Sequence, residues 1–206
     1  MEPTPETAIE LARAAHRRLI ATAERIDDRG ARRPTRLPGW TVGHVLTHLA
    51  RNADGHTRRL EGALQGREVA RYPGGDAQRD GEIETGAGRP ADELIRDLID
   101  SVTRLEQTWS RSEQAGWPHT ELLAADRFPT TGSPLRRLRE VEIHHVDLGL
   151  GYQPSDWPDE YVEWELATSL ERLPMRLGGG TEARRFLAWL TGRADWPEGL
   201  TLTPWL

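Results

Sequence analysis

The stretch REVEIHHVDLGLGY, residues 139–152, combines two carboxylates, two adjacent histidines and an aspartate. Glu140 and His144 are four residues apart, a spacing that on an α-helix stacks both side chains on one face, about one turn from each other. A carboxylate and an imidazole presented together can serve as two ligands of a divalent metal ion. The stretch therefore predicts a helix that holds part of a metal site and needs a third ligand from elsewhere.

Arg136 and Asp147 share this helix face, because successive residues of an α-helix are separated by about 100°. Asp147, one turn after His144, could orient a metal-bound histidine. The alternative is an ordinary Glu–His pair on a helix surface. For His145 and Glu142, which lie off this face, we expect solvated or structural roles. Apolar residues border this polar face on both sides, and they are Val141, Leu148, Ile143 and Leu150. We therefore expect the face to point into a core or cleft.

The composition indicates a globular protein, since 36% of the 206 residues are hydrophobic and 29% are charged. The net charge of −6, with arginines scattered among acids, argues against nucleic acid as the main partner. No apolar run approaches the roughly 20 residues that cross a bilayer. The acidic N-terminus has no apolar signal-peptide core, so we expect a cytoplasmic protein. Because cysteine is absent, a metal must be bound by His, Asp and Glu, and thiol chemistry needs an external thiol.

Apolar residues recur at helical spacing in four long segments, at about 5–28, 41–64, 90–114 and from Ser133 through the quoted stretch. Thr41 is expected to cap the second helix, and Pro90 to begin the third. The segments 66–89 and 115–132 contain glycine and proline and are predicted to be irregular connections. Four long amphipathic helices predict a mainly α protein with a four-helix bundle.

The pattern changes after Gly151. Residues 158–173 and 181–191 predict two shorter helices, and GLTLTPWL at 199–206 predicts one short strand. We therefore expect two parts, a metal-binding bundle in residues 1–155 and a small C-terminal α(+β) appendage in residues 156–206, packed on the bundle. Five tryptophans are expected to dock this appendage: Trp157, Trp164, Trp189, Trp196 and Trp205.

The second predicted helix offers candidates for the third metal ligand at four-residue intervals: His44, His48, Asn52 and His56. Periodicity does not choose among them. His56 lies nearest the centre of the apolar stripe, whereas His44 and His48 lie towards its margin. Each histidine could instead be a surface residue or a hydrogen-bonded core residue.

Together, LPGWTVGHVLTHLARNADG at 37–55 and REVEIHHVDLGLGY at 139–152 resemble the mycothiol-dependent maleylpyruvate isomerase family, which belongs to the DinB-like metal-binding bundles. The resemblance covers residues 5–155, and LAWLTGR at 187–193 also resembles the family's C-terminal region. It implies that the histidine ending HVxxH, the glutamate of REVE and the first histidine of HH bind a divalent metal, usually zinc. In this chain they are His48, Glu140 and His144. It also implies that mycothiol is the external thiol.

In the family reaction, a thiolate adds to the cis double bond of maleylpyruvate and leaves after rotation, which gives fumarylpyruvate. Arginines should bind the dianionic substrate, because the guanidinium fork matches a carboxylate. Asn52 could contact cofactor or substrate, and Trp40 could line the thiol site or serve as a packing anchor. For each arginine, a solvated surface position is the alternative. The candidate arginines are Arg193, Arg184 or Arg185 in the appendage and Arg51 in the second helix.

Two other functions stay open at this point. A thiol transferase would use the same site but leave the thiol on another electrophile, and a non-catalytic bundle would hold a structural metal. An open fourth coordination position favours catalysis, whereas a fourth protein ligand favours a structural role. The expected partners are a small-molecule substrate and a low-molecular-weight thiol, with monomer and homodimer both open.

Overall fold

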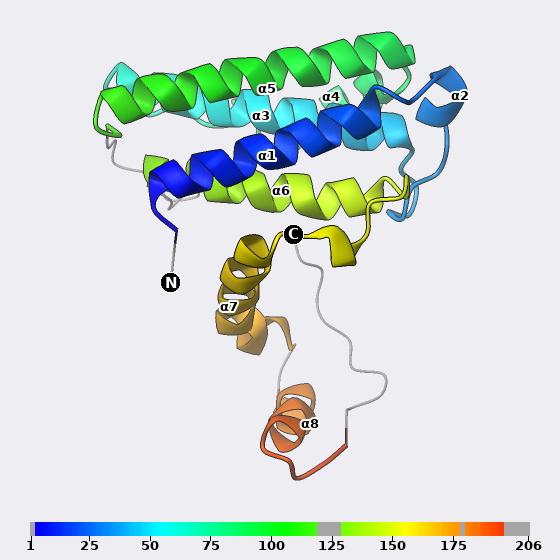
Figure 1. Cartoon of the computed structure of the whole chain (residues 1–206), viewed down its shortest axis with the longest axis vertical. Helices are drawn as coiled ribbons and strands as arrows, with labels where there is room; N and C mark the ends of the chain where they lie inside the picture. The colour runs from blue at the N-terminus through cyan, green and yellow to red at the C-terminus, as the bar shows by residue number, and fades with distance from the viewer. Residues whose placement is uncertain (1–2, 119–128, 178–179, 196–206) are drawn as a thin grey trace. The chain divides into compact units, whose positions relative to one another are not determined.

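Four long helices form the body of the chain in the computed structural model, which describes residues 3–118, 129–177 and 180–195. α3 packs against α5 and α6, and α1 packs against the same two helices, so the four lie side by side (Figure 1). The predicted mainly α bundle is confirmed, and the described residues form no β-strand. The bundle helices are α1 (Pro5–Ala23), α3 (Val42–Leu64), α5 (Ala91–Gln114) and α6 (Ser133–Asp147).

The starts of α3 and α6 follow the expected chemistry. Thr41 is the N-cap of α3, and Pro134 lies in the first turn of α6. Backbone N–H groups in a first turn have no intrahelical acceptor, so proline removes no hydrogen bond there. The Trp109 indole N–H donates to Ser133 Oγ at 3.0 Å, which ties α5 to the start of α6. Apolar side chains from all four helices fill the core, among them Leu19, Leu46, Leu49, Leu105 and Leu138.

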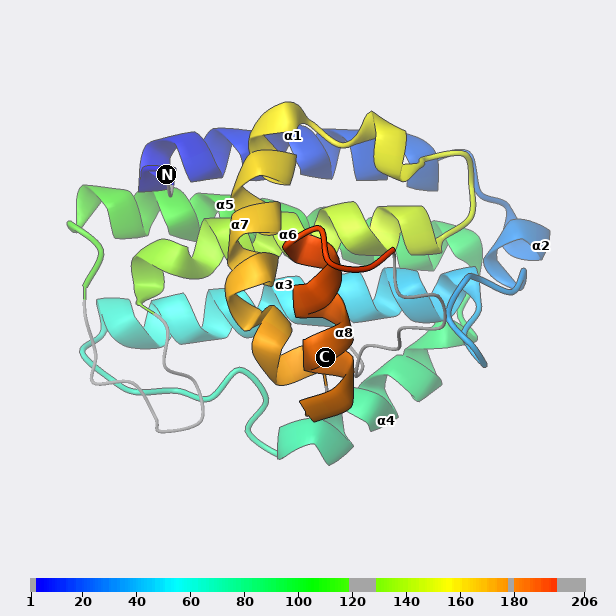
Figure 2. The same ribbon diagram turned by 90° about the horizontal axis from the view of Figure 1, so that it is seen from below.

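The prediction that residues 66–89 form an irregular connection is wrong, because α4 (Gly75–Ala87) is a helix within this segment. α4 packs against the first turns of α3 (Figure 2). A Cβ on Gly43 would lie 2.3 Å from the Ala87 carbonyl oxygen, and a Cβ on Gly86 would lie 2.5 Å from Thr47 Cγ2. α4 contacts α3 through glycines, which add no apolar side chains at helical spacing. The sequence pattern therefore did not indicate this helix.

The first helix ends earlier than predicted, at Ala23 rather than residue 28. A second helix, α2 (Asp28–Ala31), follows after a short turn. Asp27 separates the two, because its carboxylate accepts a hydrogen bond from the Gly30 N–H at 2.7 Å and so caps α2. The other predicted irregular segment, 115–132, ends in a short 3₁₀ turn, η1 (Thr130–Gly132), and a second 3₁₀ turn, η2 (Pro154–Asp156), follows α6.

The chain divides into two compact units, Glu2–Trp157 and Pro158–Leu206. The second unit contains α7 (Asp159–Arg176) and α8 (Gly180–Leu190), close to the two short helices expected there. The predicted strand at 199–206, with Trp196 and Trp205, lies outside the described residues. Docking of this unit on the bundle stays a prediction.

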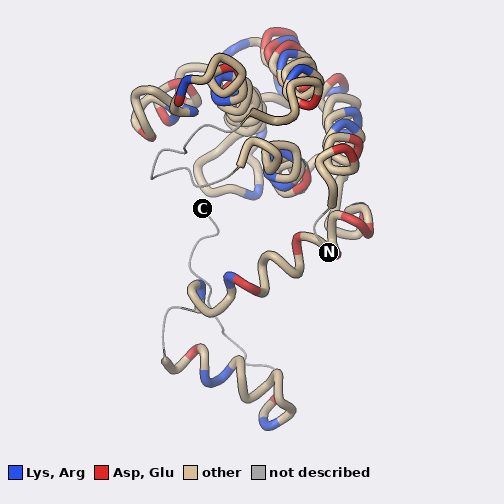
Figure 3. The backbone as a smooth tube through the Cα atoms, turned by 90° about the vertical axis from the view of Figure 1, so that its left-hand side faces the viewer, with Lys and Arg blue, Asp and Glu red and all other residues tan. Residues whose placement is uncertain are grey.

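Charged side chains of both signs are interspersed along the helices (Figure 3). Several join α3 to α5, as in the ion pair between Arg104 and Asp54 at 2.8 Å. Within the described part of the chain, no helix is both long and apolar enough to cross a membrane.

Candidate metal centre

The candidate metal centre lies where α3 and α6 run antiparallel. His48 comes from the second turn of α3, and Glu140 and His144 come from adjacent turns of α6. Farther along α3, His56 lies beside Ser133 at the start of α6, which shows the opposite directions of the two helices. The apolar residues of α3 and α6 are buried in the core, which fixes how each helix is rotated about its axis. This rotation places the three polar side chains close to one another.

The three side chains converge on one point. His48 Nε2 lies 3.0 Å from Glu140 Oε2, and His144 Nε2 lies 3.6 Å from the same oxygen. The two imidazole rings meet edge to face, with their centroids 4.7 Å apart. One ligand atom from each residue lies within 4.8 Å of the other two. The geometry therefore brings together the three residues that the resemblance selected from the sequence.

Asp147 orients His144. Its Oδ2 lies 2.9 Å from His144 Nδ1, so this nitrogen carries the proton and donates it to the carboxylate. His144 Nε2 then presents a lone pair, and it is buried without a hydrogen-bond partner among the described residues. A buried acceptor without a partner, facing a carboxylate and a second imidazole, fits a divalent cation.

The protonation states also suit a metal. Burial lowers the pKa of His48, so the ring is neutral near pH 7, as a metal ligand must be. Burial raises the pKa of Glu140, but the hydrogen bond from His48 and the surrounding positive charge, which includes Arg137, outweigh it and lower the pKa to about 2. Glu140 is therefore ionised, and the neutral imidazole of His48 faces its carboxylate.

The other two histidines of α3 have other partners. The Thr41 N–H donates to His44 Nδ1 at 3.1 Å, at the start of the helix. His56 Nδ1 lies 2.9 Å from the Ser133 hydroxyl. Neither belongs to a three-ligand cluster of the described residues. Of the three histidines of α3, His48 is thus the one that lies beside Glu140 and His144.

Trp40 lies close to the centre. Its ring centroid is 5.7 Å from that of His48 and 6.0 Å from that of His44. The turn that precedes α3 holds it there, because the Trp40 carbonyl accepts from the Thr35 N–H at 2.9 Å. The ring therefore covers one side of His48, and a contact between Trp40 and a cofactor stays a prediction.

Asn52 and Arg51 have partners within the bundle. Asn52 is buried, and its Oδ1 accepts from Arg137 Nη1 at 2.9 Å. Arg51 forms ion pairs with Asp97 at 2.5 Å and Asp54 at 3.1 Å. These contacts give both side chains structural roles, and their predicted contacts with cofactor or substrate stay predictions.

Arg193 belongs to the C-terminal unit. It is exposed, and its guanidinium donates to the backbone carbonyl of Thr191. Its predicted catalytic role therefore also stays a prediction.

Arg137 is a residue that the sequence reasoning missed. It is fully buried, and besides Asn52 it donates to the Leu49 carbonyl at 2.8 Å and to His16 Nε2 at 3.1 Å. His16 in turn donates from Nδ1 to Glu106 at 2.7 Å. The only sequence signal was the position of Arg137 three residues before Glu140, which places both on the α3 side of α6.

Glu142 and His145 face α1 instead of the metal centre. Glu142 is fully buried and accepts hydrogen bonds from Arg18 and from the Tyr152 hydroxyl. His145 stacks on Tyr152 with ring centroids 3.9 Å apart, and its Nε2 lies 2.9 Å from Thr22 Oγ1. The expectation of a solvated position is therefore wrong for both residues. The alternative expectation, a structural role, agrees with the contacts of both.

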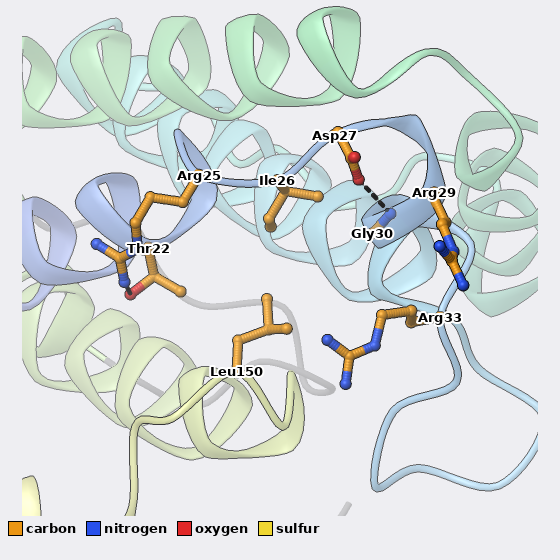
Figure 4. A pocket seen from close by; sticks show the side chains of 8 residues that line it. All are labelled: Thr22, Arg25, Ile26, Asp27, Arg29, Gly30, Arg33 and Leu150. Carbon is orange, nitrogen blue, oxygen red and sulfur yellow. Dashed lines mark hydrogen bonds between the residues drawn. The ribbon is translucent and has the colours of Figure 1, made fainter.

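A separate cleft of about 560 Å³ lies between the end of α1, α2 and the turn after α6 (Figure 4). None of the three residues of the metal centre lines it. Its lining residues are Thr22, Arg25, Ile26, Asp27, Arg29, Gly30, Arg33 and Leu150.

An antiparallel helix bundle with two histidines and a glutamate converging between two helices defines the DinB-like class of helical bundles. Within this class, the family model described as the mycothiol maleylpyruvate isomerase N-terminal domain matches residues 12–149. The match spans well over half of the chain, and the protein belongs to this family.

The chain is similar to a crystal structure of the mycothiol-dependent maleylpyruvate isomerase, with a TM-score of 0.72 and 29% sequence identity. The similarity covers 79% of this chain and 67% of that one. The structure of a histidine-to-alanine mutant of the isomerase matches to the same extent. No curated protein matches this sequence significantly.

Proposed function

We propose that this protein is a mycothiol-dependent cis–trans isomerase that converts maleylpyruvate into fumarylpyruvate. The observation that carries the proposal is the convergence of His48, Glu140 and His144, whose Nε2 accepts no hydrogen bond from the described residues. Family membership supports the same reading. The chain has no cysteine, so a thiol-dependent reaction requires a thiol from outside.

His48, Glu140 and His144 would hold the metal, for which we propose zinc because its catalytic sites use three nitrogen and oxygen ligands and one open position. A zinc ion there would lower the pKa of a coordinated thiol, so that the thiolate is present at neutral pH. Mycothiol would supply this thiol, whose reversible addition converts the double bond into a single bond that can rotate.

The protein's own residues prepare the site for this chemistry. Asp147 keeps the His144 lone pair directed at the metal position, and Glu140 stays ionised. Trp40 shields one side of His48 from water. We propose that Arg193 binds a substrate carboxylate and that Arg51 and Asn52 contact the cofactor or support the residues that do. A cytoplasmic location would keep the thiol reduced.

The test adds mycothiol and maleylpyruvate to zinc-loaded protein and follows the loss of substrate absorbance. We expect turnover by the wild type and a fall of at least about 100-fold in His48→Ala, because the metal ligand is lost. His44→Ala is the matched control, since this histidine lies one turn earlier on α3 and caps the helix; it should keep its activity.

No turnover by the wild type, or full turnover by His48→Ala, would refute the isomerase proposal. Mass spectrometry of the products separates isomerisation from transfer, because a transferase leaves a stable thiol adduct. Zinc content gives an independent readout of the ligands. A Glu140→Ala/His144→Ala double variant that still binds stoichiometric zinc would contradict the ligand assignment.

A further inference from the structure

Tyr72 lies in the segment between α3 and α4, which runs back along the surface of α3. Val69 packs against Gly62, where a Cβ would lie 2.6 Å from Val69 Cγ2. Arg58 donates to the carbonyl of Arg71, and a Cβ on Gly55 would lie 3.7 Å from Tyr72 Cζ. The segment therefore follows α3 toward its N-terminus and lays the phenol ring against Gly55.

Gly55 connects this ring to the metal centre. It follows His48 by seven residues, about two helical turns, so both lie on the same face of α3, roughly 10 Å apart along the axis. Glu140 and Arg137 of α6 both act electrostatically on the Tyr72 phenol. Because Tyr72 Cζ lies against Gly55, the end of the ring that carries the hydroxyl is on the face of α3 that also carries His48.

The Tyr72 hydroxyl is available as a hydrogen-bond donor. It makes no hydrogen bond within the described part of the chain, although the ring is half-buried. Burial raises the pKa of Tyr72, so the phenol keeps its proton at neutral pH. The Arg71 guanidinium lies over the ring, 5.9 Å from its centroid, and holds it against α3.

We propose that Tyr72 is a catalytic residue that donates a hydrogen bond to the substrate ketone conjugated with the double bond. This inference rests on the proposed isomerase function. As the carbon–sulfur bond forms, the π electron pair of the double bond shifts onto the ketone oxygen, and it returns when that bond breaks. No proton is gained or lost in this exchange. A fixed O–H donor stabilises the negative charge while it resides on the oxygen.

The direct test is Tyr72→Phe in the full chain loaded with zinc. We expect kcat to fall about 100-fold, as for loss of one oxyanion donor, with zinc content unchanged and KM raised about fivefold at most. Tyr152→Phe is the control, because its hydroxyl binds Glu142 on the α1 side of α6; its kcat per bound zinc should be unchanged. A kcat for Tyr72→Phe within twofold of the wild type would overturn the proposal.

A second pair of variants moves the ring without removing the hydroxyl. Gly55→Ala adds a Cβ in ordinary van der Waals contact, 3.4 Å from Arg71 Cβ and 3.7 Å from Tyr72 Cζ, so activity should persist. Gly55→Leu extends beyond that space and displaces the ring, so kcat should fall as in Tyr72→Phe. Equal activity of the two variants would contradict the proposal.

A binding measurement separates this inference from the isomerase proposal. Acetylpyruvate, a diketo acid without the double bond, is titrated calorimetrically into zinc-loaded, thiol-free protein. Loss of one hydrogen bond should weaken its binding about fivefold in Tyr72→Phe. If the wild type fails to isomerise but this difference remains, the isomerase proposal fails and the Tyr72 contact stands. An unchanged dissociation constant overturns the contact itself.

Discussion

The bond between Asp147 and His144 decides which nitrogen of the imidazole faces Glu140. A free imidazole could present either nitrogen, and only one tautomer leaves Nε2 as an acceptor. Asp147 selects that tautomer from one turn away on α6, at 2.9 Å. Sequence spacing predicted that these residues share a face and that Asp147 could orient a ligand. The contact agrees with both expectations.

Replacement of Asp147 by alanine should weaken zinc binding about 10–100-fold, because His144 loses the partner that sets its tautomer and orientation. Asp147→Asn should fall in between, since an amide oxygen still accepts the bond. Competition with a chromophoric chelator measures both affinities. Asp54→Ala is the control, as this carboxylate pairs with Arg51 and Arg104. Unchanged affinity in Asp147→Ala would exclude the orienting role.

At the scale of elements, the contact between α3 and α4 depends on glycine rather than on apolar side chains. Gly43 on α3 meets the Ala87 carbonyl of α4, and Gly86 on α4 meets Thr47. α4 has few apolar residues of its own, with Ile83 as its main buried large side chain. Its stability therefore comes from packing on α3, which explains why a local pattern did not reveal it.

Gly43→Ala should lower the free energy of unfolding by about 1–3 kcal/mol, because its Cβ would overlap the backbone of α4. Gly81→Ala, with open space around the added Cβ, should raise it by about 0.5–1 kcal/mol through helix propensity. Urea denaturation compares the two. Equal effects of the two substitutions would show that α4 does not pack as closely as described.

At the scale of the whole molecule, one polar network joins all four bundle helices. It runs from Glu106 on α5 through His16 on α1 to Arg137 on α6 and ends at Asn52 on α3. Burial lowers the pKa of His16 to about 4, so its ring is neutral and can accept from Arg137. The network crosses the core one helical turn from the metal centre and fixes the spacing of α3 and α6.

Two buried histidines should make the stability depend on pH. Burial lowers the pKa of both His16 and His145 to about 4, whereas an unfolded histidine titrates near 6.5. The unfolded chain therefore binds more protons between these values. Stability should be complete above about pH 6.5 and should fall as the pH drops toward 4.

Urea midpoints measured from pH 7.5 to 4.5 test this expectation, and His145→Gln should flatten part of the slope. A midpoint independent of pH across this range would contradict the neutral, buried state of the two rings. A metal-free sample and a zinc-loaded sample are compared at each pH, because bound metal adds its own stabilisation.

Local signals accounted for much of the fold. Thr41, Ser133 and the apolar stripes marked α3, α5 and α6 close to their observed limits. The same signals failed between residues 66 and 89, where α4 depends on a contact with a distant helix. They also missed Asp27, whose cap interrupts the first predicted helix. Each failure concerns a helix end or a helix whose stability comes from packing.

The sequence by itself determined the helical periods, and with them the shared face of Glu140, His144 and Asp147 on α6. Spacing along one helix is local geometry, so it needs no knowledge of the rest of the fold. Periodicity could not choose His48 over His56, although His56 lies nearer the centre of the apolar stripe of α3. Resemblance suggested that choice, and the tertiary structure supports it by setting His48 beside Glu140 and His56 beside Ser133. Tertiary structure also decided the partners of Arg137, whose hydrogen bonds to Asn52 and to the Leu49 carbonyl join α6 to α3, and it laid the Tyr72 ring against Gly55.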